Sequence, residues 1–358
     1  MADVSELTIH ALSGDYGVRI GEGRFDALLN DHPNAFLVID SFFADLLGDH
    51  AARTVLVSAR EDRKTLSGVE EIVEQLRDRG VTRGDELLGV GGGIVQDLAT
   101  AAASLYMRGL PWRYVPTTLL GMADSCIGGK SSLNVGPYKN LAGNFHPPGE
   151  VIVDPRFIDT LGEEDRAGGL CEAMKISFCR GPRCYEAYLE LHQAFEAQRT
   201  GAVALLHHVL SAKQWFIETD EFDRAERRQL NFGHTFGHAL EAATGFAVSH
   251  GIAVGLGVVC AERLAVAVDG ERAAQPALRD HALALVRRAP DLARRLDSLD
   301  LELFERAFLS DKKHRADGLH LMLPDEGRGV AERVLPNDEV TLSRVRGALD
   351  EMIRMVEE

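Results

Sequence analysis

The chain has 358 residues, 45% of which are hydrophobic, and it carries a formal net charge of −16 at pH 7. This length exceeds what a single hydrophobic core usually serves, so we expect two domains. The acidic balance argues against a nucleic-acid partner, which binds a basic face, but it allows a locally basic pocket for a small anion.

The N-terminal sequence and the cysteines bear on the cellular location. The opening MADVSELTIH contains acids and no apolar run, which argues against a secretory signal. No apolar stretch approaches the roughly 20 residues of a membrane-spanning helix, and the longest, around 252–259, predicts a buried helix. The five cysteines include no C-x-x-C pair, and an odd number fits reduced thiols. We therefore expect a cytoplasmic protein without a membrane partner.

The first half of the chain alternates between strand and helix patterns. Residues 6–20 alternate in polarity around Gly14, which predicts a short antiparallel pair. Further strands are expected at 35–40, 53–59, 86–90, 112–116 and 150–154, and helices at 69–80 and 95–107. Because strands that alternate with helices need crossover connections, this half predicts a Rossmann-like α/β domain with a parallel sheet.

The second half changes character. From Asp159 onward the patterns are almost entirely helical. We therefore place a boundary near 155–160, with an α/β domain at residues 1–157 and an all-α domain at residues 158–358.

A glycine-rich turn, GVGGGIVQD at 89–97, follows a strand and opens a helix. Glycines let the backbone approach a ligand closely, and a helix N-terminus favours a diphosphate. The spacing is not G-x-G-x-x-G, so a plain tight turn explains it equally well. Asp97 could accept from a hydroxyl or cap the first turn. Asp40, at the end of a strand, lies where a ribose-binding acid often sits, although a helix cap fits nearly as well.

The segment at 120–149 is long and polar for a loop. It contains Asp124, Lys130, Asn134, Lys139 and Asn140 among glycines. Two lysines near backbone amides favour a phosphate or carboxylate site, and the alternative is a solvated loop. The strand before it ends in Thr117 and Thr118, which plain turn chemistry explains as well.

Three histidines lie close together in the helical half. His234 and His238 are one turn apart on a helix predicted over 232–244, and His250 follows a turn. They could converge on one metal ion, or they could be hydrogen-bonded core residues. Glu172, on a predicted apolar helix with Lys175, supplies the acid that an open three-ligand catalytic site needs. The alternative for Glu172 and Lys175 is a surface ion pair.

Other basic and amide residues follow helical patterns in this half. Lys213, Arg227 and Asn231 could face the same cavity, although each alone is more often a surface residue. DKKHR, at 311–315, is a further basic cluster whose alternative is a solvated loop.

Taken together, these segments resemble the 3-dehydroquinate synthase family, within the sugar-phosphate cyclase superfamily. The match is nearly collinear from about Glu61 to Lys313. Its motifs are GGG-IVQD, RG-x-x-x-x-x-VPTTLL, DS-x-IGGK, KNL-x-G, GL-x-E-x-x-K, and LNFGHTFGHALE followed by HG.

The resemblance implies an NAD-binding α/β domain and a helical metal-binding domain with the active site in a cleft between them. Glu172, His234 and His250 match the family's ligands to a divalent metal, zinc or cobalt. His238 then becomes a base that supports the ligands or faces the substrate. The positions matching NAD contacts are Asp40, Glu61, Lys64, Gly92, Gly93, Asp97, Thr117, Thr118 and Thr160, and the lysines Lys130 and Lys139 border both the cofactor and the substrate.

The remaining matches concern the substrate. The positions that match the substrate pocket and catalysis are Asp124, Asn140, Lys175, Lys213, Arg227 and Asn231. Arg108 matches a residue that reaches the substrate phosphate across a dimer interface, which implies a homodimer. Lys312 or Lys313 closes the site.

The reaction implied converts 3-deoxy-D-arabino-heptulosonate 7-phosphate to 3-dehydroquinate and phosphate, with transient oxidation by NAD, elimination, reduction and aldol closure. The alternatives are a paralogue acting on sedoheptulose 7-phosphate or an amino analogue, and a metal-dependent, NAD-linked polyol dehydrogenase. Three residues depart from the family pattern: Gln96 replaces a usual Gly, Cys171 a usual Ala, and Ile252 a usual Glu.

Overall fold

A computed structural model of the chain describes residues 4–136, 138–198, 201–326 and 329–358. The chain forms two compact units. Unit 1 comprises Met1–Leu161 and Phe195–Glu221, and unit 2 comprises Gly162–Ala194 and Phe222–Glu358.

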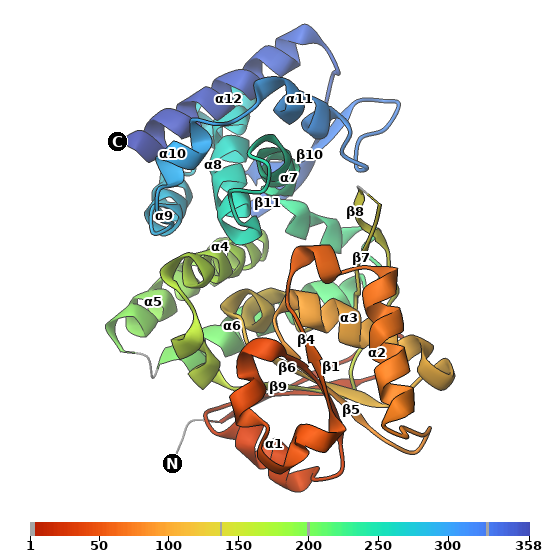
Figure 1. Ribbon diagram of the computed structural model, residues 1–358. Helices are drawn as coiled ribbons and strands as arrows, with labels where there is room; N and C mark the ends of the chain where they lie inside the picture. The colour runs from red at the N-terminus through yellow and green to blue at the C-terminus, as the bar shows by residue number, and fades with distance from the viewer. Residues whose placement is uncertain (1–3, 137, 199–200, 327–328) are drawn as a thin grey trace. The chain divides into compact units, whose positions relative to one another are not determined.

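Unit 1 is built on a seven-stranded sheet of order β1-β2-β9-β6-β5-β3-β4 (Figure 1). Its strands are β1 (Ser5–Ile9), β2 (Tyr16–Ile20), β3 (Phe36–Asp40), β4 (Thr54–Val57), β5 (Leu87–Gly91), β6 (Trp112–Pro116) and β9 (Glu150–Val153). The pair β1–β2 is antiparallel and the other pairings are parallel. The predicted parallel sheet and its antiparallel edge pair are therefore confirmed.

Helices cover this sheet. They are α1 (Arg24–Asp31), α2 (Leu66–Asp78), α3 (Gly93–Leu105) and α6 (Ala202–Thr219). α2 begins where the hydroxyl of Thr65 accepts a hydrogen bond from Gly68 N, and it packs beside α3. α3 contacts β5 and β6, so the turn that links β5 to α3 lies at the carboxyl edge of the sheet.

Two features of unit 1 differ from the sequence-based expectation. The helix α6 lies far along the chain, yet it packs on β1, where Gln214 Nε2 donates to Thr8 O at 2.8 Å. A boundary at 157 alone therefore does not describe the units, because contacts rather than chain order define them. The supposed loop at 120–149 also contains a hairpin, β7 (Leu133–Val135) with β8 (Tyr138–Ala142).

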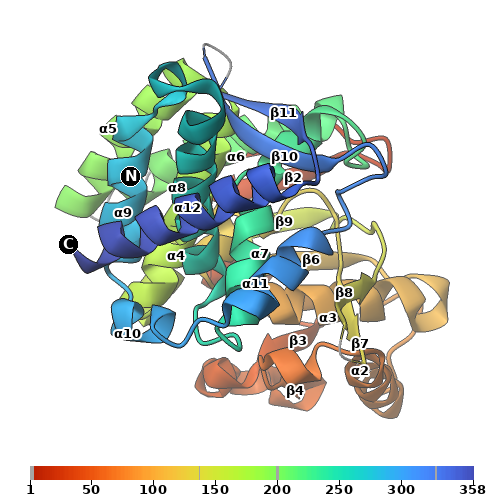
Figure 2. The same cartoon turned by 90° about the horizontal axis from the view of Figure 1, so that it is seen from above.

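Unit 2 is predominantly helical. Its longer helices are α4 (Glu163–Cys179), α7 (His234–Ala243), α8 (His250–Asp269), α9 (Pro276–Val286), α11 (Leu301–Leu309) and α12 (Glu339–Glu357); α5 (Pro182–Ala197) starts in this unit, and α10 (Leu292–Leu296) is one short turn. α8 is the central element, because α4, α7, α9 and α12 all pack against it. α7 also lies beside α11 (Figure 2).

The expectation of an all-α second domain needs a correction. An antiparallel hairpin, β10 (Leu319–Asp325) with β11 (Gly329–Leu335), belongs to unit 2. Its first strand, LHLMLPD, is buried along nearly its whole length, so it lacks the alternation that reveals a half-buried strand.

The apolar helix α8 also exceeds what we expected. It is 20 residues long, and an 18-residue stretch of it has a mean hydropathy of 1.9, so by length and composition alone it could cross a membrane. However, 78% of that stretch is buried inside the protein, as is usual for the core helix of a globular unit.

Candidate metal and nucleotide sites

The candidate metal site of unit 2 depends on a close crossing of α4 and α8. Gly168 and Gly251 meet there backbone to backbone, and a Cβ on Gly251 would lie 2.5 Å from Gly168 Cα. Glu172 is one helical turn beyond Gly168, and His250 precedes Gly251. The two glycines therefore allow the carboxylate and the imidazole to approach each other.

A second close contact brings α7 against α8. A Cβ on Gly257 would lie 2.0 Å from Gly233 O, and one on Gly237 would lie 3.0 Å from Ala253 O. Gly233 adopts a left-handed conformation (φ 77°) immediately before His234, the first residue of α7. The small residues of α8 thus bring α4 and α7, with their candidate ligands, to the same end of one helix.

Glu172, His234 and His250 meet at this point. Glu172 is 1% exposed, and its Oε1 lies 3.6 Å from Nε2 of His234 and 3.6 Å from Nε2 of His250. Within the described part of the chain, Oε1 accepts no hydrogen bond. Two ligands that are each about 2.1 Å from a tetrahedral zinc ion lie about 3.4 Å apart. The three side chains therefore fit a divalent cation of this size.

The pKa shifts of Glu172 and His234 suit a cation, whereas that of His250 has the opposite direction. Burial opposes ionisation of Glu172, but Lys175 and His250 outweigh it and hold the pKa of the carboxyl at about 2. Burial, assisted by Lys175, lowers the pKa of His234 well below its ordinary value, so its imidazole is neutral and able to coordinate. For His250, burial is outweighed by the carboxylates of Glu172 and Glu241, which raise the pKa.

Lys175 belongs to the same cluster. Its Nζ lies 2.5 Å from Glu172 Oε2, and its side chain is 2% exposed. The surface ion pair considered from the sequence is thus excluded, because both partners are buried. Oε2 faces the lysine while Oε1 faces the two histidines, which divides the two carboxylate oxygens between a fixed charge and the candidate cation.

His238 lies on α7 one turn beyond His234. Its ring stacks near that of His250, with centroids 5.8 Å apart. Burial, together with His250 and Lys313, lowers the pKa of His238 to about 4, so its imidazole is neutral at pH 7. A neutral imidazole at this position is able to accept a proton.

Both candidate ligand histidines are held through their other ring nitrogen. His234 Nδ1 lies 3.2 Å from Phe232 O, and His250 Nδ1 lies 3.1 Å from Glu241 Oε2. Glu241 was missed from the sequence. Its spacing on α7 could have revealed it: Glu241 follows His234 by seven residues and His238 by three, which puts the three side chains on one helical face.

The predicted anion-binding residues of unit 2 are Arg227, Asn231 and one of Lys312 and Lys313. Arg227 is 4% exposed, on the short helix η8 (Glu226–Asn231), and Asn231 Nδ2 donates to Arg228 O at 3.0 Å. Lys313 Nζ lies 2.6 Å from Asp311 Oδ2 and 3.5 Å from Thr235 Oγ1, whereas Lys312 is exposed. Of the two lysines left open by the sequence, Lys313 is the one that contacts α7.

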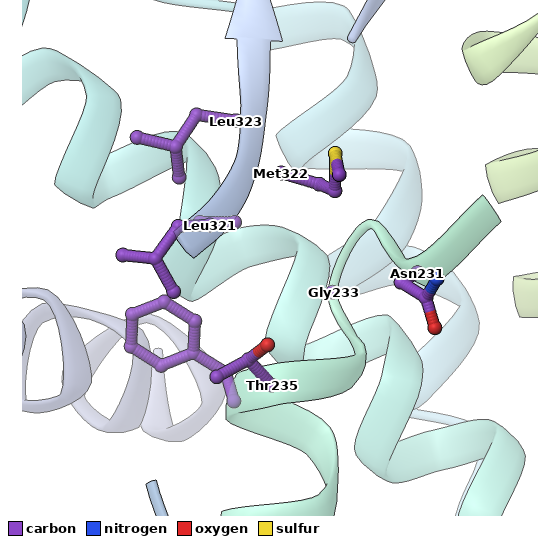
Figure 3. Close-up of a pocket in the computed structure, with 8 residues that line it drawn as sticks. Asn231, Gly233, Thr235, Leu321, Met322 and Leu323 are labelled. Atoms are coloured by element: carbon purple, nitrogen blue, oxygen red, sulfur yellow. The ribbon is translucent and has the colours of Figure 1, made fainter. Parts of the chain in front are cut away.

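A small cavity of about 10 Å³ lies behind the turn into α7 (Figure 3). Asn231, Gly233 and Thr235 line it together with the β10 residues Leu321, Met322 and Leu323. This volume is about that of one water molecule, so the cavity is too small for a substrate.

Unit 1 gathers a separate polar cluster around the β7–β8 hairpin. Lys64 Nζ lies 3.1 Å from Asp97 Oδ2, 2.8 Å from Asn140 Oδ1 and 3.9 Å from Glu61 Oε1. Lys139 Nζ is also 3.9 Å from Glu61 Oε1. Five of the predicted cofactor and substrate residues therefore lie together, although they are distant in the sequence.

Two further residues belong to this cluster: Asn134, which the sequence placed in the polar segment at 120–149, and Ser132, which was not predicted. Asn134 Nδ2 donates to Glu61 Oε1 at 2.8 Å, and its Oδ1 accepts from Asn140 N at 3.0 Å. Ser132 N donates to Asp97 Oδ1 at 3.0 Å. Burial raises the pKa of Asp97 to about 6 although Lys64 opposes the shift, so this carboxylate is easily protonated.

The glycine turn between β5 and α3 is closely packed on one side and open on the other. A Cβ on Gly92 would lie 2.8 Å from Thr118 Cγ2, whereas a Cβ on Gly93 would meet nothing within 4 Å. Thr117 N donates to Gly91 O at 3.0 Å, and Thr118 Oγ1 accepts from Gly121 N at 3.1 Å. The first turn of α3 is thus accessible to a ligand from the Gly93 side.

Gln96, which departs from the family pattern, forms a specific contact. Its Nε2 donates to Ser125 O and its Oε1 accepts from Ser125 Oγ, both at 2.6 Å. Asp124 Oδ1 lies 2.7 Å from Lys213 Nζ, which also donates to Ile127 O at 3.1 Å. The segment around Ser125 is therefore anchored from α3 and from α6, and Lys213 acts here as an anchor.

Four further predicted residues make local contacts or are exposed. Asp40 accepts from Phe42 N at 3.1 Å and so caps the short helix after β3. Exposed Thr160 donates to Phe157 O at 2.7 Å, and Lys130 lies over the Phe145 ring at 5.7 Å. Arg108 is exposed and has a left-handed backbone (φ 70°).

Comparison with known proteins identifies the family. Residues 54–167 match 3-dehydroquinate synthase N-terminal, and residues 169–314 match 3-dehydroquinate synthase C-terminal. A 3-dehydroquinate synthase of Saccharolobus solfataricus is 34% identical over 349 residues, which is 94% of this chain and 96% of the relative. The chain belongs to the 3-dehydroquinate synthase family. It is thus a carbocycle-forming lyase of the sugar-phosphate cyclase type.

Two further comparisons agree. A 3-dehydroquinate synthase of Streptococcus pneumoniae (strain JJA) is 35% identical over 267 residues, which is 74% of each chain. Among solved structures, 2-epi-5-epi-valiolone synthase of Streptomyces hygroscopicus subsp. jinggangensis 5008, with NAD+ and Zn2+ bound, has a TM-score of 0.78. It is 24% identical and covers 95% of this chain and 97% of that one, which shows a shared fold.

Proposed function

We propose that this protein converts 3-deoxy-D-arabino-heptulosonate 7-phosphate to 3-dehydroquinate and inorganic phosphate. The family supports the reaction class, because relatives that match most of the chain are 3-dehydroquinate synthases. The observation that carries the proposal is the position of Glu172 Oε1, buried and 3.6 Å from two imidazole nitrogens.

The cofactors proposed are NAD and one zinc or cobalt ion. Glu172, His234 and His250 would hold the cation, and Glu61, Lys64, Asp97 and the turn at Gly92 and Gly93 would hold the dinucleotide. When bound, NAD takes up and returns a hydride while the cation polarises the substrate oxygens.

The chain's own residues supply charge and proton transfer. Arg227, Asn231 and Lys313 would bind the substrate carboxylate, because unit 2 contributes two cationic groups and one amide at these positions. His238 is neutral at pH 7, so it accepts the proton that leaves when a hydroxyl is oxidised. Lys175 keeps Glu172 ionised and so maintains the ligand charge during turnover.

The finer assignments are part of the same proposal. Arg108 is exposed, and we infer that it would contact the phosphate of a substrate bound by a second copy of the chain. This role would require a homodimer. The location proposed is the cytoplasm, where the five cysteines of the chain would remain reduced. The α/β unit would bind NAD, and the helical unit would bind the metal and the substrate carboxylate.

A phosphate-release assay tests the proposal. Protein loaded with zinc or cobalt and NAD is expected to release phosphate from the heptulosonate substrate, and chelation is expected to abolish the release. Turnover of sedoheptulose 7-phosphate in place of the heptulosonate would assign the protein to a different cyclase. Steady accumulation of NADH with a simple polyol would support the dehydrogenase alternative, since a cyclase returns its hydride.

A further inference from the structure

Of the three candidate ligands, His250 is the one least restrained by packing. Its side chain is 39% exposed, against 14% for His234 and 1% for Glu172. His250 is also the first residue of α8, so no preceding helical turn confines its ring. A metal ligand with this freedom needs another group to fix the orientation of its ring.

Glu241 provides such a group. Its Oε2 lies 3.1 Å from His250 Nδ1, and its side chain is only 12% exposed. A carboxylate oxygen accepts and cannot donate, so this contact requires the proton of the neutral imidazole to be on Nδ1. The lone pair is then on Nε2, the atom that lies 3.6 Å from Glu172 Oε1.

A competing arrangement makes this control important. His238, Glu241 and His250 form a second group whose ligand atoms also lie within 4.8 Å of one another. A cation there would use the other face of the same histidine cluster. A proton held on His250 Nδ1 by Glu241 excludes that nitrogen from coordination and directs the cation toward Glu172 and His234.

We propose that Glu241 is the positioning residue of the metal site, which fixes the tautomer and ring orientation of His250 so that one cation binds between Glu172, His234 and His250. This inference rests on the metal dependence in the proposed function, and it adds a residue that does not itself contact the cation. For His234 the corresponding acceptor is the backbone carbonyl of Phe232, which substitution cannot remove.

The test measures metal affinity rather than turnover. Metal-free wild type, Glu241→Gln and Glu241→Ala are titrated with Zn2+ against a chromophoric chelator. Removal of a carboxylate that orients a ligand histidine typically weakens metal affinity by about 10- to 100-fold. We expect about a tenfold loss for Glu241→Gln, whose amide oxygen still accepts, and a loss closer to 100-fold for Glu241→Ala.

Two controls separate positioning from other roles. Glu262→Gln alters another buried carboxylate, on α8 and twelve residues beyond His250, and is expected to leave the affinity unchanged. His238→Asn is also expected to leave the affinity unchanged, whereas it would weaken binding if the cation were held by His238 and Glu241.

The absorption spectrum of the Co2+-loaded protein supplies a second readout. Glu241→Ala is expected to change the cobalt bands because His250 no longer has one orientation, while Glu262→Gln retains the wild-type bands. Wild-type affinity and wild-type bands in Glu241→Ala would overturn the inference. If circular dichroism shows that Glu241→Ala does not fold, the near-isosteric Glu241→Gln tests the inference by the same two measurements, the Zn2+ affinity and the Co2+ absorption bands.

The outcome is distinguishable from failure of the proposed function. If wild type binds Zn2+ with the expected dependence on Glu241 but releases no phosphate from either sugar phosphate, the reaction is wrong and the positioning role stands. If wild type releases phosphate while Glu241→Ala binds Zn2+ as tightly as wild type, the positioning role is wrong and the reaction stands.

Discussion

In unit 1, the charged residues around Lys64 already satisfy one another, whereas in unit 2 the buried Glu172 Oε1 faces two imidazoles without a hydrogen bond from the described residues. The ammonium group of Lys64 lies close to the amide oxygen of Asn140 and to the carboxylates of Asp97 and Glu61. The first cluster can therefore be stable before its ligand arrives. The second contains a buried anion and two imidazoles, of which His234 is held neutral and His250 has a raised pKa, and a divalent cation can bind between them once the proton on His250 Nε2 is displaced.

The strongest test of this comparison is to remove the acid of unit 2. Glu172→Gln is expected to weaken Zn2+ binding by more than about 100-fold, because a first-contact carboxylate is lost rather than an orienting one. Chelator competition measures the change. Asp97→Asn, the matching substitution in unit 1, is the control, and an equal loss there would contradict the division between the clusters.

The next test concerns the helix crossing that assembles the metal site. Gly251→Ala is expected to lower the free energy of unfolding by about 3 kcal/mol or more, because its Cβ would clash with the Gly168 backbone. Gly347→Ala, on α12 of the same unit, is the matched control, since its Cβ would meet nothing within 4 Å. There we expect a gain of about 0.5–1 kcal/mol.

Both variants are measured by denaturant unfolding in the absence of metal. Gly251→Ala should also weaken Zn2+ binding, because the shifted crossing separates Glu172 from His250. Retention of wild-type stability in Gly251→Ala would mean that the crossing relaxes without cost.

A pH titration examines the unit 1 cluster. The folded pKa of Asp97 is about 6 and exceeds its ordinary value of 3.8, so the folded state binds this proton more tightly. Its contribution to the unfolding free energy is therefore lost as the pH rises from about 4 to about 6, by roughly 2–3 kcal/mol. In NAD-free Asp97→Asn we expect this part of the decline to disappear.

The control for that titration is Asp78→Asn, which removes an exposed carboxylate at the end of α2. It is expected to keep the wild-type pH dependence. A decline of full size in Asp97→Asn would show that other groups cause it.

The smallest expected effect concerns the β10–β11 hairpin. Glu332 on β11 pairs with Arg228 on η8 and with His320 on β10, at 3.0 Å from its Nδ1. Because Arg228 and Glu332 are partly exposed, Glu332→Gln is expected to lower the unfolding free energy by less than about 1 kcal/mol. Thermal unfolding measures the change in unfolding free energy, and Glu302→Gln, which alters an exposed carboxylate, is the control. A larger loss in Glu332→Gln would show that the hairpin contributes more to the stability of η8.

Several elements could be predicted because their signals are local. The continuous apolar run of β3 and the glycine stop after α2 each depend on neighbouring residues only. The place of α6 could not be predicted, because a helix pattern does not specify which sheet the helix will cover. The β10–β11 hairpin was missed since a fully buried strand has no alternation.

The candidate metal site was predicted in part from spacing. The histidines of α7 shared a face by helical periodicity, but their spacing alone favoured His234 and His238 as a ligand pair as readily as His234 and His250. The structure brings Glu172 Oε1 within 3.6 Å of His234 and His250, and it gives Glu241 to the other nitrogen of His250.

By itself, the sequence determined which chemical groups are present and which of them share a helix or follow a strand, since those relations are set by the covalent chain and its 3.6- or 2-residue periods. Only the tertiary structure decided which groups meet. The meeting of α4, α7 and α8 depends on glycine contacts between segments that are separated in the sequence, such as Gly168 with Gly251 and Gly233 with Gly257. Such contacts arise from packing, which no local pattern encodes.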